Sequence, residues 1–99
     1  MRKYKIKIHD VIFEDNIFTI ISAKNERFIS NIIKGSVNFN IYNGLNKEIN
    51  LNGLQKDKII KIYGKLENNN IVIKKVCVCD KYVFYSDSSE NSEDFKLIN

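Results

Sequence analysis

Few residues in this chain could carry out catalysis or hold a metal, and they are widely spaced. His9 is the single histidine, so every catalytic set that needs a histidine must use it. Cys77 and Cys79, followed by Asp80, are separated by one residue, whereas zinc ligands usually come as two pairs spaced C-x₂₋₄-C. No glycine-rich phosphate loop occurs either. We therefore predict that the protein is not an enzyme, uses no cofactor or metal, and keeps the two cysteines as structural thiols.

A larger set of residues has the chemistry of a binding surface. Lysines alternate with apolar residues in several stretches, and tyrosines and asparagines join them on the same side of the expected strands. The candidate nucleic-acid-binding residues are Lys3, Lys5, Lys7, Asn40, Tyr42, Lys61, Tyr63, Lys65, Lys74 and Lys75. Lysines can follow a phosphate backbone, tyrosines can stack on bases and amides can read base edges. The alternative is that these are ordinary solvated strand faces, whose lysines discourage edge pairing.

The composition is that of one small domain. The chain has 99 residues, of which 43% are hydrophobic, and no apolar run is long enough to span a membrane as a helix. The N-terminus starts basic but alternates at once, unlike a signal peptide. Two neighbouring cysteines form no disulfide framework. We expect an intracellular protein without membrane association, and the sequence leaves open whether it is nuclear or cytoplasmic.

The charge is divided unevenly along the chain. Residues 1–83 contain 15 basic and 8 acidic residues, a net charge of +7, whereas residues 84–99 have a net charge of −3. We predict a barrel domain over 1–83 and an acidic, flexible tail over 84–99. A basic body with an acidic end is common among nucleic-acid binders, and the tail could compete with phosphate for the basic part. Charge that only keeps a small domain in solution is the alternative.

The first third of the chain predicts strands. Tyr4, Ile6 and Ile8 alternate with lysines, and the phase slips after His9-Asp10, which indicates a bulge in a long first strand. A second strand follows over 16–22. Residues 24–35 fit a helix or a strand, and we favour a strand because β-branched residues dominate there.

The remainder predicts two further hairpins. Residues 36–42 alternate as one strand, and Asn43-Gly44 predicts a tight turn into a return strand over 45–51. The stretch 59–79 is expected to form two strands around the turn Glu-Asn-Asn-Asn, with a bulge at Lys74-Lys75 and Gly64 where another backbone approaches closely. The predicted fold class is all-β, a small barrel of five to six strands with at most one short helix.

This pattern resembles an oligonucleotide/oligosaccharide-binding (OB) fold over roughly residues 3–80. The resemblance rests on the bulged first strand KYKIKIHDVIF, the second strand NIFTIIS and the hairpin KIIKIYGKLENNNIVIKKVCV, whose step Tyr63-Gly64-Lys65-Leu66 is similar to one in the fourth strand of small OB domains. The chain is most similar to the small OB subunits of replication protein A and of telomere-capping complexes. It departs from the family in its short turn at 67–70 and in lacking a clear helix, which residues 45–57 would have to supply.

Two hypotheses for function follow. The first is a non-catalytic module that binds single-stranded DNA or RNA through its basic, tyrosine-bearing strand face. The second is a small structural subunit of a replication, telomeric or ribosome-associated nucleoprotein assembly, in which contacts with protein partner subunits dominate. The two hypotheses differ in whether the isolated chain binds nucleic acid.

Overall fold

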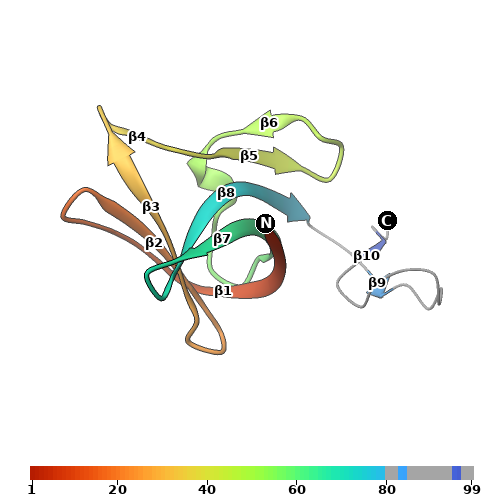
Figure 1. Ribbon diagram of the computed structural model, residues 1–99. Helices are drawn as coiled ribbons and strands as arrows, with labels where there is room; N and C mark the ends of the chain where they lie inside the picture. Colours follow the sequence, from red (N-terminus) through yellow and green to blue (C-terminus); the bar gives the residue numbers. More distant parts are fainter. Residues whose placement is uncertain (80–82, 85–94, 97–99) are drawn as a thin grey trace.

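The described part of the chain folds mainly into strands, as predicted. A computed structural model describes residues 1–79, 83–84 and 95–96. The elements are β1 (Arg2–Glu14), β2 (Ile17–Ser22), β3 (Arg27–Ile33), β4 (Ser36–Val37), β5 (Asn40–Asn43), β6 (Glu48–Ile49), the 3₁₀ turn η1 (Leu51–Gly53), β7 (Ile59–Glu67), β8 (Asn70–Cys79), β9 (Val83–Phe84) and β10 (Phe95–Lys96). Figure 1 shows their arrangement. The all-β fold class is confirmed.

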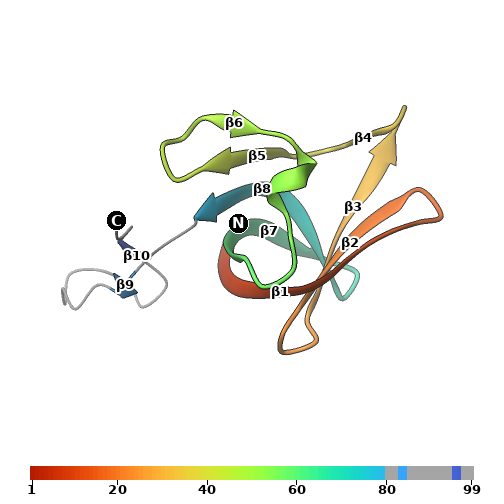
Figure 2. The ribbon, with the colours of Figure 1, turned by 180° about the vertical axis from the view of Figure 1, so that it is seen from behind.

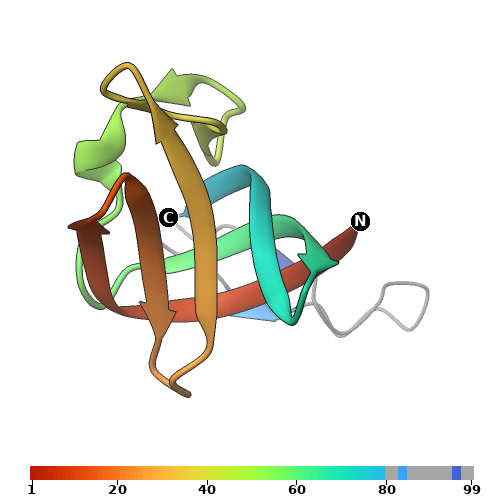
Figure 3. The ribbon, with the colours of Figure 1, turned by 60° about the vertical axis from the view of Figure 1, so that its left-hand side comes forward.

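Five of the strands close into a barrel-like ring. The sheet runs in the order β4-β3-β2-β1-β7-β8-β5-β6, and a parallel pairing of β3 with β8 joins β1, β2, β3, β8 and β7 into a closed circuit. The first strand serves both sides of this ring, because residues 2–7 pair with β7 and residues 8–14 pair with β2. The register shifts between Ile8 and Asp10, where the bulge was predicted. Figure 3 shows β1, β2, β3 and β8 side by side.

Three two-residue turns join neighbouring strands, two of them within the ring and one between β3 and β4. They lie at Asp15-Asn16, Lys34-Gly35 and Asn68-Asn69, and all six residues have positive φ angles between 49° and 83°. This is the conformation of a type I′ turn, which matches the right-handed twist of the flanking strands. Asn and Gly tolerate positive φ well. The prediction of a tight turn within 67–70 is therefore confirmed.

The hairpin of β7 and β8 contains the second predicted bulge. The register passes from Tyr63 opposite Lys75 to Gly64 opposite Ile73, so Lys74 is the extra residue. A Cβ atom on Gly64 would lie 3.0 Å from the carbonyl oxygen of Val72. Only glycine therefore allows the two backbones to approach this closely.

The interior of the ring is filled by isoleucine, valine and phenylalanine. The most completely buried side chains are Phe18, Phe28, Ile8, Ile20, Ile60, Ile62, Ile73 and Val76. Phe39, Ile41 and Leu54 extend this core from the segment between β3 and β7. Ile6 and Ile8 are buried, as their alternation predicted, and Tyr4 packs edge-on against Phe28 with 5.2 Å between ring centroids. The alternation with Ile60 and Ile62 would place Leu66 inside as well, but Leu66 is 57% exposed because it lies near the end of β7.

The segment between β3 and β7 differs from the prediction. Residues 36–42 do not form one strand, because Asn38 and Phe39 interrupt it, although Phe39 and Ile41 are buried as expected. Asn43-Gly44 does not form a two-residue turn. Instead the Asn43 side chain accepts hydrogen bonds from the backbone N–H groups of Leu45 (2.9 Å) and Lys47 (3.0 Å), which stabilises a longer loop. The return strand is therefore limited to Glu48–Ile49, and only η1 is helical here.

Other predictions stand as follows. Residues 24–35 contain β3, so the strand was the correct alternative. Figure 2 shows β5 and β6 lying on one side of the ring, next to β8.

Most of the predicted acidic tail over 84–99 lies outside the described residues; β9 and β10 form a separate antiparallel pair. In the described part of the chain, no helix has the length and apolar character needed to cross a membrane.

Candidate nucleic-acid interface

Four neighbouring strands place most of the predicted binding residues on one outer surface. The first half of β1, the first half of β7, the second half of β8 and β5 are consecutive in the sheet. Their outward residues form one row of Lys3, Tyr63, Lys75 and Asn40, and a second row of Lys5, Lys61, Cys77 and Tyr42. Lys7 continues the line of lysines along β1. We call these nine residues the basic face.

Lys75 is the central cation of the basic face. Its Nζ atom lies 5.1 Å from the ring centroid of Tyr42 and 5.3 Å from that of Tyr63. The Nζ atom of Lys3 lies 5.9 Å from the centroid of Tyr63 on the other side. A cation within about 6 Å of an aromatic ring is attracted to its negative face. These contacts hold both tyrosine rings beside positive charge.

Hydrogen bonds support the end of the basic face formed by β5. The Asn40 amide donates to the Tyr42 hydroxyl oxygen at 3.2 Å, which ties two outward side chains together. The Cys77 thiol donates to the backbone carbonyl of Asn43 at 3.6 Å, across the parallel pairing of β5 and β8. Cys77 is half-buried, which fits the predicted structural thiol. Tyr42 is therefore positioned by its neighbours on the same surface.

Two of the predicted residues lie away from the two rows. Lys65 follows Gly64 in β7 and is opposite Val72 of β8, which in turn pairs with Ile29 of β3. Lys74 is the extra residue of the bulge in β8, and its Nζ atom lies 3.8 Å from a carboxylate oxygen of Glu67. The bulge shifts the register after Tyr63, so that neither lysine lies opposite a residue of the two rows. Lys65 and Lys74 are therefore exposed beside the basic face but do not belong to its two rows.

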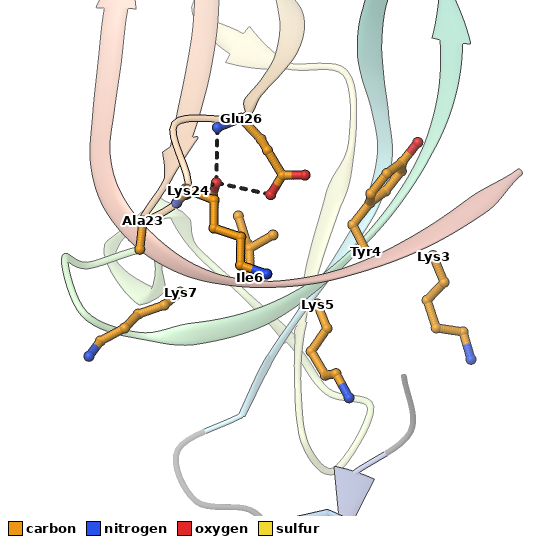
Figure 4. Close-up of a pocket in the computed structure, with 9 residues that line it drawn as sticks. Lys3, Tyr4, Lys5, Ile6, Lys7, Ala23, Lys24 and Glu26 are labelled. Carbon is orange, nitrogen blue, oxygen red and sulfur yellow. Dashed lines mark hydrogen bonds between the residues drawn. The ribbon is translucent and has the colours of Figure 1, made fainter. Parts of the chain in front are cut away.

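A hollow of about 360 Å³ adjoins the basic face along β1. Figure 4 shows Lys3, Lys5 and Lys7 on one side of β1 and Tyr4 on the other. The turn between β2 and β3 closes the hollow with Ala23, Lys24 and Glu26. The buried Ser22 hydroxyl donates to the Glu26 carboxylate at 3.1 Å and accepts from the Glu26 backbone N–H at 3.0 Å, which holds this turn in place.

Sequence reasoning did not include two residues of this region. Lys24 lines the hollow beside the β1 lysines, although it belongs to a turn between other strands. Cys77 lies in the basic face between Lys61 and Tyr42. The alternation of Lys75, Cys77 and Cys79 on β8 could have indicated the position of Cys77. Nothing in the local sequence signals that Lys24 lies near β1, because that proximity comes from the fold.

The basic face combines fixed positive charge with two aromatic rings and an amide. Such a combination can bind a flexible polyanion whose units carry flat rings. Among the described residues, no three histidine, cysteine or acidic side chains are grouped closely enough to hold a metal ion. Comparison of the chain with protein-family models, with curated proteins and with solved structures found no match.

Proposed function

We propose that this protein is a non-catalytic module that binds single-stranded DNA or RNA on the basic face. The observation that carries the proposal is the arrangement around Lys75, whose ammonium group lies between the rings of Tyr42 and Tyr63. Nucleic acid offers phosphates for the cation and bases for the rings at the same time. A duplex keeps its bases stacked inside, so the two tyrosines favour single strands.

Each type of residue has a separate role in this proposal. The lysines of β1 and β7 attract phosphates and release condensed counterions, which gives salt-dependent affinity. Tyr42 and Tyr63 provide ring faces for bases, and a stacked base contributes about 1–3 kcal/mol of binding free energy. Asn40 presents an amide next to the Tyr42 hydroxyl, where it can meet a base edge or a sugar hydroxyl.

We also propose that the ring is an OB-type barrel. Support comes from the consecutive β1–β2–β3 sheet, the bulged first strand shared by both halves, and the closure through β7 and β8. A five-stranded, partly open barrel of the OB type binds oligonucleotides mainly on the face of its second and third strands. In this protein the basic residues gather on β1, β7, β8 and β5, whereas β2 and β3 carry mainly isoleucine outside.

The second candidate function is that of a structural subunit in a nucleoprotein assembly. The observation that favours it is the apolar outer surface of β2 and β3, where Ile33 is 56% exposed. Exposed apolar patches on small domains commonly mark protein contacts. Under this function the basic face would contribute to nucleic-acid contact only within the assembly.

Fluorescence anisotropy separates the two candidates. The purified full chain is titrated into labelled single-stranded DNA, single-stranded RNA and duplex DNA of about 20 nucleotides, longer than the roughly 4–16 that one barrel covers. We expect single strands to bind with a dissociation constant in the micromolar range or below, and affinity to fall steeply between 50 and 200 mM salt. Equal binding of duplex would contradict the role of the tyrosines. No binding at low salt would overturn the binding proposal and favour the structural subunit.

A further inference from the structure

The outer surface of the β1–β2–β3 sheet carries a group of aliphatic side chains among charged and polar ones. Beyond the bulge, the paired outward residues form three rows across these strands: Asp10, Ile21 and Arg27; Ile12, Thr19 and Ile29; and Glu14, Ile17 and Asn31. Val72 of β8 lies beside Ile29, and Ile33 continues β3. We define the isoleucine face as Ile12, Ile17, Thr19, Ile21, Ile29, Ile33 and Val72. Six of these seven side chains are aliphatic.

The isoleucine face does not belong to the interior of the ring. Partly buried apolar residues such as Val11 and Ile32 pack against the core, but Ile12, Ile29 and Val72 do not. Ile17 and Ile33 are 38% and 56% exposed, whereas Ile21 is only 7% exposed. The remaining members, Ile12, Thr19, Ile29 and Val72, are half-buried. Figure 3 shows this side of the sheet toward the viewer, and no other described element crosses in front of it. An apolar sheet face of this kind loses contact with water only when another surface covers it.

Opposite charges flank the two sides of the isoleucine face. Asp10 and Glu14 lie on the β1 side, and Arg27 lies on the β3 side. Asp10 and Arg27 belong to the same row and are separated by Ile21 on the middle strand. Strands lie about 4.8 Å apart, so Asp10 and Arg27 are two strand spacings from each other within one chain. The surface is therefore negative along one side and positive along the other.

We propose that the isoleucine face pairs with the same face of a second copy of this chain. A two-fold axis along β2 places β1 of each copy over β3 of the other. Ile12 then faces Ile29, and Thr19 faces Thr19. Each Asp10 faces the partner's Arg27, and each Arg27 faces the partner's Asp10. An interface between identical copies must be self-complementary. If both sides of the face carried charges of the same sign, two copies would repel each other.

The charge pattern selects this occupant over a different protein. A different protein would need an apolar surface with a cation opposite Asp10 and an anion opposite Arg27. Nothing in this chain points to such a protein. A second copy provides that order automatically. Two sheets packed face to face with nearly parallel strands are also a common arrangement in β-proteins. The basic face lies outside this contact, because its residues come from the first half of β1 and from β5, β7 and β8.

Sedimentation velocity of the full chain at several concentrations tests the pairing. We expect dimers to dominate at about 100 µM and monomers to appear on dilution. Ile17→Ser and Ile33→Ser each replace an already exposed side chain, so the fold should remain, and each should weaken dimerisation at least about tenfold. Thermal melting followed by circular dichroism confirms folding of each variant.

A charge exchange makes the test specific to two identical faces. Asp10→Lys places two cations opposite each other, and Arg27→Asp places two carboxylates opposite each other, so each single change should weaken the dimer at least about tenfold. The double variant restores opposite charges and should recover affinity to within a few-fold of the original. Glu48→Lys on β6 makes the same charge change away from the face and should leave the dimer intact. A chain that stays monomeric, or a dimer that responds to Glu48→Lys as it does to Asp10→Lys, overturns the proposal.

Discussion

The basic face and the isoleucine face share one long strand, β1, yet the residues that β1 contributes to them differ in charge and polarity. Before the bulge, β1 presents Lys3, Lys5 and Lys7 to the outside. After the bulge it presents Asp10, Ile12 and Glu14. The same alternation of side chains thus produces a lysine-rich surface on one half and a surface with isoleucine and two acidic residues on the other.

The bulge is the feature that separates the two surfaces. Without the register shift between Ile8 and Asp10, the positions facing the interior would change sides along β1. The extra residue keeps Ile6 and Ile8 inside in the first half and Val11 inside in the second half. A bulge also bends the strand, so that its halves lie in differently oriented parts of the ring. The comparison teaches that one irregularity can give a small barrel two independent faces.

The largest expected effect comes from breaking the shared interior. Ile62 is completely buried in β7, so Ile62→Ala should lower the free energy of unfolding by about 2–5 kcal/mol, whereas Ile62→Val should lower it by about 0.5–1.5 kcal/mol. Urea denaturation followed by circular dichroism measures both. Nucleic-acid binding and dimerisation should be lost together at the same lower urea concentration. Retained binding beyond the unfolding transition would show that the ring does not position the basic face.

A change on the basic face should weaken nucleic-acid binding without affecting dimerisation through the isoleucine face. Tyr63→Ala removes a ring that lies 5.3 Å from the Lys75 cation, and binding of single strands should weaken by about 1–3 kcal/mol. Tyr63→Phe keeps the ring and should bind nearly as the original does. Anisotropy measures binding, and sedimentation should show unchanged dimers. Equal loss in the alanine and phenylalanine variants would contradict base stacking by this ring.

A smaller effect is expected from removing one phosphate contact. Lys75→Gln should weaken binding of all sequences alike and reduce the slope of log affinity against log salt by about 0.7–0.9. Lys34→Asn is the matched control. It removes the same charge at the β3–β4 turn, where φ is 52° and asparagine is tolerated. If both variants changed the slope equally, net charge rather than position would explain binding.

The smallest effect is expected at the neighbouring lysine. Lys74 contacts Glu67 on the surface, and both side chains are nearly half exposed. Lys74→Gln should therefore change the free energy of unfolding by less than about 1 kcal/mol. It should also reduce affinity for single strands less than Lys75→Gln does, since the bulge places Lys74 outside the two rows. A larger loss at Lys74 would shift the binding surface toward the β7–β8 turn.

The strands, bulges and turns of the ring could be predicted from the sequence because each depends on residues close together in the chain. Alternation placed Ile6 and Ile8 inside, and slips of phase located both bulges. The turn at Asn68-Asn69 follows from the tolerance of asparagine for positive φ. These features depend on neighbours in the chain.

The segment between β3 and β7 and the grouping of the site were harder to predict. Asn43-Gly44 suggested a tight turn, but the Asn43 side chain stabilises a longer loop. Lys74 and Lys75 are adjacent in sequence, and only the register with β7 shows that one pairs with Glu67 while the other lies between two tyrosines. The isoleucine face was not foreseen, because outward apolar residues on three strands become one surface only after pairing.

The most direct test of the proposed basic face is a nuclear magnetic resonance titration of the full chain with a short single-stranded oligonucleotide. We expect shifts in the ring signals of Tyr42 and Tyr63 and in the amide signals of the strands that form the basic face. The signals of Ile17, Ile29 and Ile33 should instead respond to dilution of the protein. Shifts concentrated on β2 and β3, with Tyr42 and Tyr63 unchanged, would contradict binding on the basic face.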